Sequence, residues 1–412
     1  MAELKYWLWL RTLRGLSNSA CLDLLAHFGD AEHIYYADAE EYAHVEQLTK
    51  KQRSLLENKD TAAAETILEQ CAALGISILT IGDAAYPDRL RAIPDAPCVL
   101  YWKGAWPDFD SEAAVAVIGT RKATPYGIRM GERLGYTLSK GGAYVVSGLA
   151  AGGDAAGHRG ALLAGKRTAA VLGGGIDVVY PRENAALYDD IAASGVLISE
   201  YPPGTEPKGH HFLERNRIIS GLSAAVVVVE AALRSGTLNT VHHALEQSRD
   251  VYAVPGPVDA PCSQGCNRLI QEGAGLVSDG WDILRDLQPR FPQRIERYLF
   301  DLPPSIGRGA AEKGTAAQQE APAEDAVSAE NEIDKTEEKA YIEIENSRDR
   351  FTDDQIQLLL TLSEHPMTVD DLAETAQIPV RRVLSALTDL EIDALVRQVS
   401  GNRYILNALI KE

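Results

Sequence analysis

The sequence lacks any long hydrophobic run, and its first residues lack the pattern of a leader. Its 412 residues contain no stretch of uncharged apolar residues as long as the ~18 that a membrane-spanning helix needs. The opening residues, MAELKYWLWLRTLRG, include aromatics but neither a long apolar region nor a cleavage site of small residues. We therefore expect a cytoplasmic protein with no membrane span and no signal peptide.

Cysteine is scarce as well. A small, odd number of scattered cysteines in a chain of this length is typical of reduced thiols in a cytosol. Cys262 and Cys266 have no second Cys or His pair at the spacing of a zinc finger, and a structural zinc site needs about four ligands. The sequence thus predicts free thiols and no metal site. The five cysteines are Cys21, Cys71, Cys98, Cys262 and Cys266.

Acidic side chains outnumber basic ones, and the formal net charge is −19. Residues 312–345 contain 11 acidic and 3 basic side chains, a net charge of −8. This segment is also rich in Ala, Pro and Ser and poor in aromatics, so it cannot bury enough apolar surface to offset chain entropy. We predict a flexible acidic linker over residues 290–350. The rest of the chain is only mildly acidic, which leaves room for a local basic cleft.

Continuous apolar runs alternate with helical patterns between residues 71 and 289. Such runs are expected for strands that are buried on both faces of a parallel sheet. Their alternation with helices is typical of an α/β fold with a doubly wound, Rossmann-like sheet. The predicted strands are 76–81, 114–119, 143–148, 168–173, 195–200, 224–231 and 250–256.

Helical patterns flank this core on both sides. Residues 1–70 predict a small helical domain of the helix-hairpin-helix or SAM-like kind, with a simple helical cap on the core as the alternative. Residues 351–412 predict three helices followed by two short strands around Ser400-Gly401-Asn402. That order is typical of a winged-helix domain.

Four of the predicted core strands end in small, glycine-rich loops. In open α/β sheets the ligand binds at the carboxyl ends of the strands, and a helix N-terminus there favours an anion. Plain tight turns would explain one or two such loops but explain four poorly. We therefore predict a phosphate-binding edge. The loops are 119–121, 147–154, 173–177 and 230–237.

The standard nucleotide-binding and catalytic motifs are incomplete. Residues 160–167 nearly match the Walker A spacing but lack its final Ser or Thr and end a helix. Gly173-Gly174-Gly175 follows a strand without completing the dinucleotide pattern GxGxxG. No GxSxG, HExxH or triad-like arrangement stands out. The sequence therefore predicts no ATP or dinucleotide cofactor and shows no standard catalytic motif.

Basic and aromatic side chains gather in residues 207–222. Lys208, Arg215 and Arg217 lie close to Phe212 in the sequence, and Arg121 follows another strand end. A basic groove with an aromatic platform suits single-stranded DNA, because phosphates meet cations and a base stacks on the ring for about 1–3 kcal/mol. The alternatives are that Phe212 is a core contact and that Arg217 forms an internal ion pair with Glu200 or Glu230.

With these segments the chain resembles the DNA-processing protein A (DprA/Smf) family of bacteria. The resemblance covers about residues 75–285 without large gaps. It rests on AYPDRLRAIPDAPCVLYWKG, VIGTRKATPYG, VVSGLAAGGDAAGHRGAL, VLGGGIDVVYPREN, FLERNRIISGLS, VVVEAALRSGTLNT, YAVPG and NRLIQEGA.

The resemblance implies a function as well as a fold. Members of the family bind single-stranded DNA without catalysis, help to load a RecA-type recombinase, and protect incoming DNA in natural transformation. They form homodimers through the Rossmann-like core. The implied DNA-binding residues are Gly119, Thr120, Arg121, Ser147, Gly148, Lys208, Phe212, Arg215, Asn216, Arg217, Gly236 and Thr237.

Two other functions stay open. One is an enzyme like the nucleotide phosphoribohydrolases, because Gly236-Thr237 with Glu246 loosely matches their phosphate loop, although their PGGxGTxxE signature is missing. The other is a regulator that binds DNA through the winged helix while the core only dimerises. Arg381 and Arg382 lie in the helix that would recognise DNA or a protein there.

Overall fold

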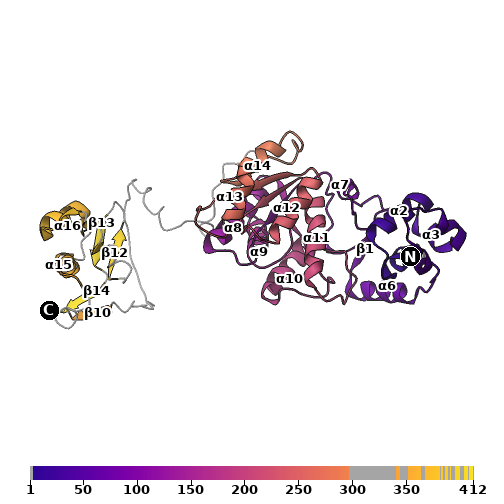
Figure 1. Ribbon diagram of the computed structural model, residues 1–412, viewed down its shortest axis with the longest axis horizontal. Coiled ribbons are helices and arrows are strands. Elements are labelled where there is room, and N and C mark those ends of the chain that lie inside the picture. Colours follow the sequence, from indigo (N-terminus) through magenta and orange to yellow (C-terminus); the bar gives the residue numbers. More distant parts are fainter. Residues whose placement is uncertain are drawn as a thin grey trace, which may run out of the picture. The chain divides into compact units, whose positions relative to one another are not determined.

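The computed structural model of the chain describes residues 3–296, 340–343, 351–362, 367–380 and shorter stretches between 382 and 411. They belong to two compact units, which divide after Gly307. The N-terminal unit contains a group of helices and a nine-stranded sheet with helices on both faces (Figure 1).

The helices before residue 75 are built around an apolar first helix, whose residues 7–10 are all buried. Side-chain oxygens of Ser17 and Asp30 accept backbone N–H groups and so start the second and third helices. This hydrophobic core also includes Tyr101 and Leu197 of the sheet, so the helices and the sheet form one unit. The helices are α1 Leu4–Thr12, α2 Asn18–Phe28, α3 Ala31–Tyr36, α4 Ala39–Ala43, α5 Lys50–Leu56 and α6 Ala62–Leu74.

The sheet confirms the predicted doubly wound α/β core. Its strand order is β1-β2-β6-β5-β4-β3-β7-β8-β9, and all neighbours from β6 to β9 are parallel. Every predicted strand is present, whereas β2 and β9 were not predicted and β1 and β2 run antiparallel at one edge. The strands are β1 Ser77–Thr80, β2 Val99–Gly104, β3 Ala113–Ile118, β4 Ala143–Ser147, β5 Thr168–Leu172, β6 Val196–Ser199, β7 Ala225–Val228, β8 Asp250–Ala253 and β9 Gly275–Leu276.

Alternate residues of the central strands serve opposite faces of the sheet. Val115 and Val117 of β3 pack with α8, α9 and α14, whereas Ala116 and Ile118 pack with α11, α12 and α13. Successive side chains point to opposite faces of the sheet, and both faces are buried, so every residue of such a strand is apolar. The core helices are α7 Asp88–Arg91, α8 Pro125–Lys140, α9 Gly153–Leu163, α10 Ala185–Ser194, α11 Gly209–Gly221, α12 Thr237–Glu246, α13 Gln264–Gln271 and α14 Gly280–Leu287.

The direction of winding reverses between β3 and β7. From β3 the chain adds β4, β5 and β6 on one side, then crosses back and adds β7, β8 and β9 on the other. The loops after β3 and β7 therefore diverge and leave a crevice at the carboxyl edge of the sheet.

The C-terminal unit contains the elements of a winged helix. Helices α15 Asp353–Thr361 and α16 Val369–Ala376 accompany a sheet in which β13 lies between β11 and β12. The predicted third helix lies partly outside the described residues, as do Arg381 and the turn 400–402. The remaining strands are β10 Ala340–Glu343, β11 Met367–Thr368, β12 Val396–Val399, β13 Arg403–Leu406 and β14 Ala408–Lys411, and β10 pairs with β14.

The predicted linker over 290–350 is too long at both ends. Arg290 forms an ion pair of 2.8 Å with Asp250, and Ile295 is buried in the core of the N-terminal unit, so folded chain continues through Glu296. Residues 340–343 form a strand. Most of the acidic segment lies outside the described residues.

Candidate functional site

A pocket of about 460 Å³ lies in the crevice between the loops that follow β3 and β7. Helices α9 and α12 begin beside it, so the positive ends of two helix dipoles lie next to the pocket and favour anions there. The pocket brings together eight of the residues predicted from the sequence, which are Gly119, Thr120, Arg121, Phe212, Arg215, Asn216, Gly236 and Thr237.

A second pocket of about 280 Å³ adjoins the first. It lies at the ends of β4 and β5 and is lined by Gly148, Gly173 and the half-exposed Tyr180, among others. Arg121, Ala150 and Phe212 line both pockets and so lie between them.

Glu230 fixes the loop that carries Arg121. Its main-chain oxygen accepts the N–H of Thr120 at 2.8 Å. Its buried carboxylate accepts the N–H and the hydroxyl of Thr124 at 2.8 and 2.6 Å, and Thr124 in turn caps the start of α8. Glu230 follows β7, so it ties together the two loops on either side of the switch point.

Close backbone contact explains the glycines at the start of α9. A Cβ atom on Gly153 would lie 2.5 Å from the Cα of Gly119, and one on Gly152 would lie 2.2 Å from the oxygen of Thr120. Gly152 also has a φ of +78°, which favours glycine. The loops after β3 and β4 can therefore meet only because side chains are absent from both.

Arg121 and Phe212 form the aromatic and cationic centre of the site. The guanidinium carbon of Arg121 lies 4.8 Å from the centroid of the Phe212 ring, within the range of a cation–π contact. The ring also contacts Tyr180, with centroids 5.4 Å apart. Phe212 is only half-buried, so it is neither a plain core residue nor a fully open platform.

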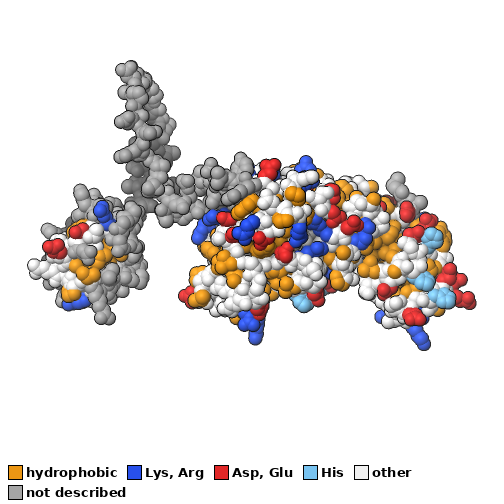
Figure 2. Space-filling model, turned by 90° about the horizontal axis from the view of Figure 1, so that it is seen from above, with side chains coloured by type: hydrophobic (Ala, Val, Ile, Leu, Met, Phe, Trp, Pro, Cys, Tyr) orange, Lys and Arg blue, Asp and Glu red, His pale blue; other side chains and the backbone are white. Residues whose placement is uncertain are grey.

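Three cations around the first pocket have no hydrogen bond or ion pair from their side chains within the part of the chain that the structure describes. These are Arg121, Lys122 and Arg234, and all three are exposed. Lys122 and Arg234 were not singled out from the sequence, although both lie beside or within the predicted strand-end loops. Figure 2 shows one face of the N-terminal unit, where basic side chains gather near the middle among acidic and hydrophobic ones.

Arg215 supports the site from beneath. It is buried, and its Nη1 donates to the main-chain oxygens of Gly148 and Val171. Burial lowers the pKa of Arg215 to about 10, an effect that the carboxylate of Asp154 opposes and Arg121 strengthens. Burial likewise raises the pKa of Asp154, which Arg215 opposes. The two charges thus stabilise each other at the base of the pocket, and most of the Arg215 side chain is unavailable to a ligand.

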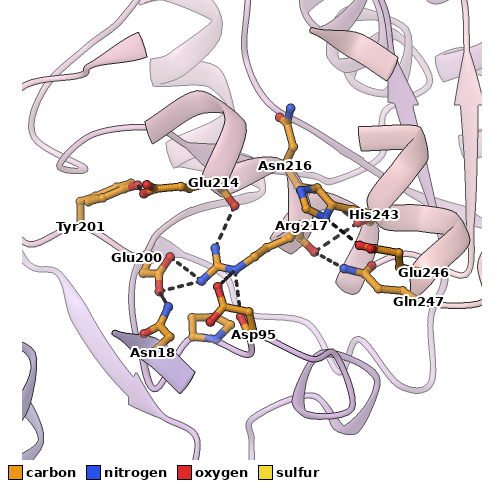
Figure 3. A network of polar contacts seen from close by, with 12 residues as sticks. Asn18, Asp95, Glu200, Tyr201, Glu214, Asn216, Arg217, His243, Glu246 and Gln247 are labelled. Carbon is orange, nitrogen blue, oxygen red and sulfur yellow. Dashed lines mark hydrogen bonds and ion pairs between the residues drawn. The ribbon is translucent and has the colours of Figure 1, made fainter. Parts of the chain in front are cut away.

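Three predicted residues lie outside both pockets. Ser147 is buried and donates its hydroxyl to the oxygen of Val117 at 2.5 Å, so it joins neighbouring strands. Lys208 is exposed just before α11. Arg217 points away from the pocket and forms an ion pair of 2.8 Å with Glu200 (Figure 3). The internal ion pair, which was the alternative for Arg217, is therefore what the structure contains, because the other face of α11 meets a buried carboxylate.

Asn216 and Thr237 reach the pocket but also make contacts within the protein. Asn216 Nδ2 donates to Asn239 Oδ1 at 3.1 Å, which joins α11 to α12. The Thr237 N–H and hydroxyl both contact the hydroxyl of Ser235 at the start of α12. These contacts fix the middle of α11 and the start of α12, which border the pocket.

No group of three or more His, Cys, Asp or Glu residues that could hold a metal ion occurs among the described residues. The five cysteines are free thiols. No helix in the described part of the chain is long and apolar enough to span a membrane.

Comparison with known proteins identifies the family. The model of DNA recombination-mediator protein A matches residues 77–288, and that of the DprA winged helix domain matches residues 345–402. Protein Smf of Synechocystis sp. is 32% identical over 409 residues, 98% of each chain. The DNA processing protein DprA of Bacillus subtilis is 41% identical over 224 residues, 54% of this chain and 75% of that protein. The X-ray structure of DNA processing protein A from Streptococcus pneumoniae matches 68% of this chain and 97% of its own, with 35% identity and a TM-score of 0.62. The chain therefore belongs to the DNA-processing protein A (DprA/Smf) family.

Proposed function

We propose that the protein binds single-stranded DNA in the pocket at the β3–β7 switch point and acts as a recombination mediator without catalysis. The observation that supports this most directly is the set of exposed cations Arg121, Lys122 and Arg234, which have no acceptor among the described residues and surround the half-buried Phe212. Phosphates would meet the cations and the helix starts, and bases would meet the aromatic and apolar side chains.

The side chains that line the pocket favour a single strand over a duplex. Phe212 and Leu213 line the same pocket as the cations, so the pocket can contact both bases and phosphates. A single strand can turn unstacked bases toward such side chains while its phosphates contact the cations. In a duplex the base faces are stacked on each other and only groove edges are accessible.

Membership of the family supports the finer parts of the proposal. These are the loading of a RecA-type recombinase, the protection of incoming DNA in natural transformation, homodimer formation through the Rossmann-like core, and action in the cytoplasm. The matched protein of Bacillus subtilis is named a DNA processing protein, and the matched family model describes a DNA recombination-mediator protein.

The decisive experiment compares binding of labelled single-stranded and double-stranded oligonucleotides over a range of salt concentrations. Single-strand affinity should fall steeply as salt rises, because phosphate neutralisation releases counterions. Preference for the duplex, or affinity that does not respond to salt, would contradict the proposal.

A truncated protein separates the core from the winged helix. Removal of residues 297–412 leaves the described part of the N-terminal unit intact, including the ion pair of Arg290 with Asp250. We expect this variant to keep most of the single-strand affinity. Loss of binding would instead favour the regulator in which the winged helix contacts DNA.

A further inference from the structure

A buried polar network joins the N-terminal helices to helix α11. At its centre the Arg217 guanidinium donates to both carboxylate oxygens of Glu200, at 2.9 and 2.8 Å, and lies 3.0 Å from a carboxylate oxygen of Asp95 (Figure 3). The side chains of Arg217 and Glu200 are each only 7% exposed. Both of these hydrogen bonds come from Arg217 Nη2. An ion pair with two hydrogen bonds at such low exposure allows little freedom of position, so it fixes α11 against the loop that follows β6.

Asn18 connects this ion pair to the helical part. Asn18 is the first residue of α2, and its Nδ2 donates to Glu200 Oε1 at 2.6 Å. The Oδ1 of Asn18 has no hydrogen-bond partner among the described residues. The amide N–H of Asn18 therefore makes the contact. Through it the N-terminal helices form one hydrogen bond to the Glu200 carboxylate, which also binds Arg217 of α11.

Helix α11 carries pocket residues on another of its faces. Phe212 and Asn216 are four residues apart, share one side of the helix and line the pocket, whereas Arg217 points to the network. The main-chain oxygen of Arg217 also accepts from Gln247 Nε2 at 3.0 Å, immediately after α12 (Figure 3). A shift at Arg217 would therefore move both helices that border the pocket.

We propose that Asn18, Glu200 and Arg217 are positioning residues for the DNA pocket, and that through Asn18 the helical N-terminal part sets the affinity of the pocket without touching the DNA. This inference rests on the proposed binding of single-stranded DNA at the β3–β7 switch point. Arg217 acts on the ligand through Phe212 and Asn216, because its own donors are engaged by Asp95, Glu200 and the oxygen of Glu214.

The test uses the full-length protein and the variant Asn18→Asp. This change replaces the donor with a carboxylate that faces Glu200, so the contact becomes repulsive. Asn58→Asp is the matched control, since Asn58 lies in the same helical part, is exposed, and accepts the Asp60 N–H through an oxygen that aspartate retains. Asn18→Ala removes the contact without adding charge, and it provides a second variant if the first folds poorly.

The readout is the affinity for labelled oligothymidine at several salt concentrations, together with the melting temperature. We expect Asn18→Asp to weaken binding about tenfold, Asn18→Ala to weaken it less, and Asn58→Asp to bind like the wild type. The slope of log affinity against log salt should stay at the wild-type value, because no phosphate contact is lost. A lower slope for Asn18→Asp would show a direct DNA contact and overturn the positioning role.

A double-mutant cycle with Glu200→Gln gives the sharpest check. Because Asn18 acts through the Glu200 carboxylate, which also accepts from Arg217, the change Asn18→Ala should have less effect when residue 200 is already glutamine. We expect N18A/E200Q to bind within about threefold of Glu200→Gln alone. Strictly additive losses, or wild-type affinity of Asn18→Asp and Asn18→Ala, would overturn the inference. If the wild type itself does not bind single-stranded DNA, the proposed function fails instead.

Discussion

The guanidinium of Arg121 lies over the ring of Phe212, with 4.8 Å between its carbon and the ring centroid. Arg121 thus covers one side of the aromatic ring that the sequence indicated as a stacking platform for bases. Guanidinium planes also accept stacked bases, and their edges bind phosphate oxygens. The two residues therefore form one composite surface, on which the exposed Arg121 meets the ligand first.

Replacement of Arg121 should weaken binding to the same extent for oligonucleotides of any base sequence. We expect Arg121→Ala to lower the affinity for single strands about tenfold, and to reduce the salt slope by about 1, because one phosphate contact is lost. Fluorescence anisotropy with oligonucleotides of different composition measures both effects. Arg129→Ala, which removes an exposed cation of α8 that is not among the pocket-lining residues, is the control. Equal effects of the two changes would remove Arg121 from the site.

The contact between Arg121 and Phe212 should make their effects on binding non-additive. Phe212→Leu keeps apolar volume but removes the ring face that holds Arg121. A double-mutant cycle with Arg121→Ala should give a coupling energy of about 0.5–2 kcal/mol in DNA binding. Strictly additive losses would show that the ring and the cation act on DNA separately.

The carboxylate of Glu230 leaves no room for a side chain at Gly127. A Cβ atom there would lie 2.1 Å from Glu230 Oε2. We therefore expect Gly127→Ala to displace Glu230, loosen the loop that it holds, and reduce the free energy of unfolding by about 1–3 kcal/mol along with DNA affinity. Chemical denaturation measures the stability. Gly209→Ala, at a helical glycine with open space around it, should be neutral or stabilising.

A buried histidine should make the fold sensitive to acid. Burial lowers the pKa of His158 to about 3, and His158 Nδ1 lies 2.7 Å from the hydroxyl of Thr168. Between pH 6.5 and 3 the unfolded state binds a proton at this residue and the folded state does not, so stability is complete above pH 6.5 and is lost as the pH falls toward 3. The loss should reach about 5 kcal/mol.

Denaturation curves at several pH values test this expectation. The hydroxyl of Thr168 donates to the oxygen of Val145, so His158 is the donor in its contact with Thr168. His158→Asn retains a donor nitrogen in a similar place but cannot titrate, and its stability should depend less on pH in this range. The exposed His44→Gln should keep the acid sensitivity of the wild type. If His158→Asn shows the same pH dependence as the wild type, other groups cause it.

The parallel core and the edge at which its loops meet could both be predicted from local sequence patterns. The runs that form β3, β4, β5 and β7 are apolar throughout because both faces of the sheet are covered, and their loops are small because backbones approach closely, as Gly119 and Gly153 do. Strand β2 escaped prediction because VLYWKG lacks a following helix and pairs antiparallel with β6.

Which cations face the pocket depends on contacts between distant segments of the chain. Arg215 and Arg217 lie two residues apart, and the sequence does not show which of them faces the ligand. In the fold Arg215 lies beneath the pocket beside Asp154, whereas Arg217 points to Glu200. Lys122 and Arg234 reach the pocket from loops more than 100 residues apart in the sequence. A local pattern fixes the face of a helix or strand that a residue occupies. The partner that the residue meets on that face belongs to a distant segment of the chain. A charged side chain that is buried against such a partner is unavailable to a ligand, whereas an exposed one without a partner can bind it.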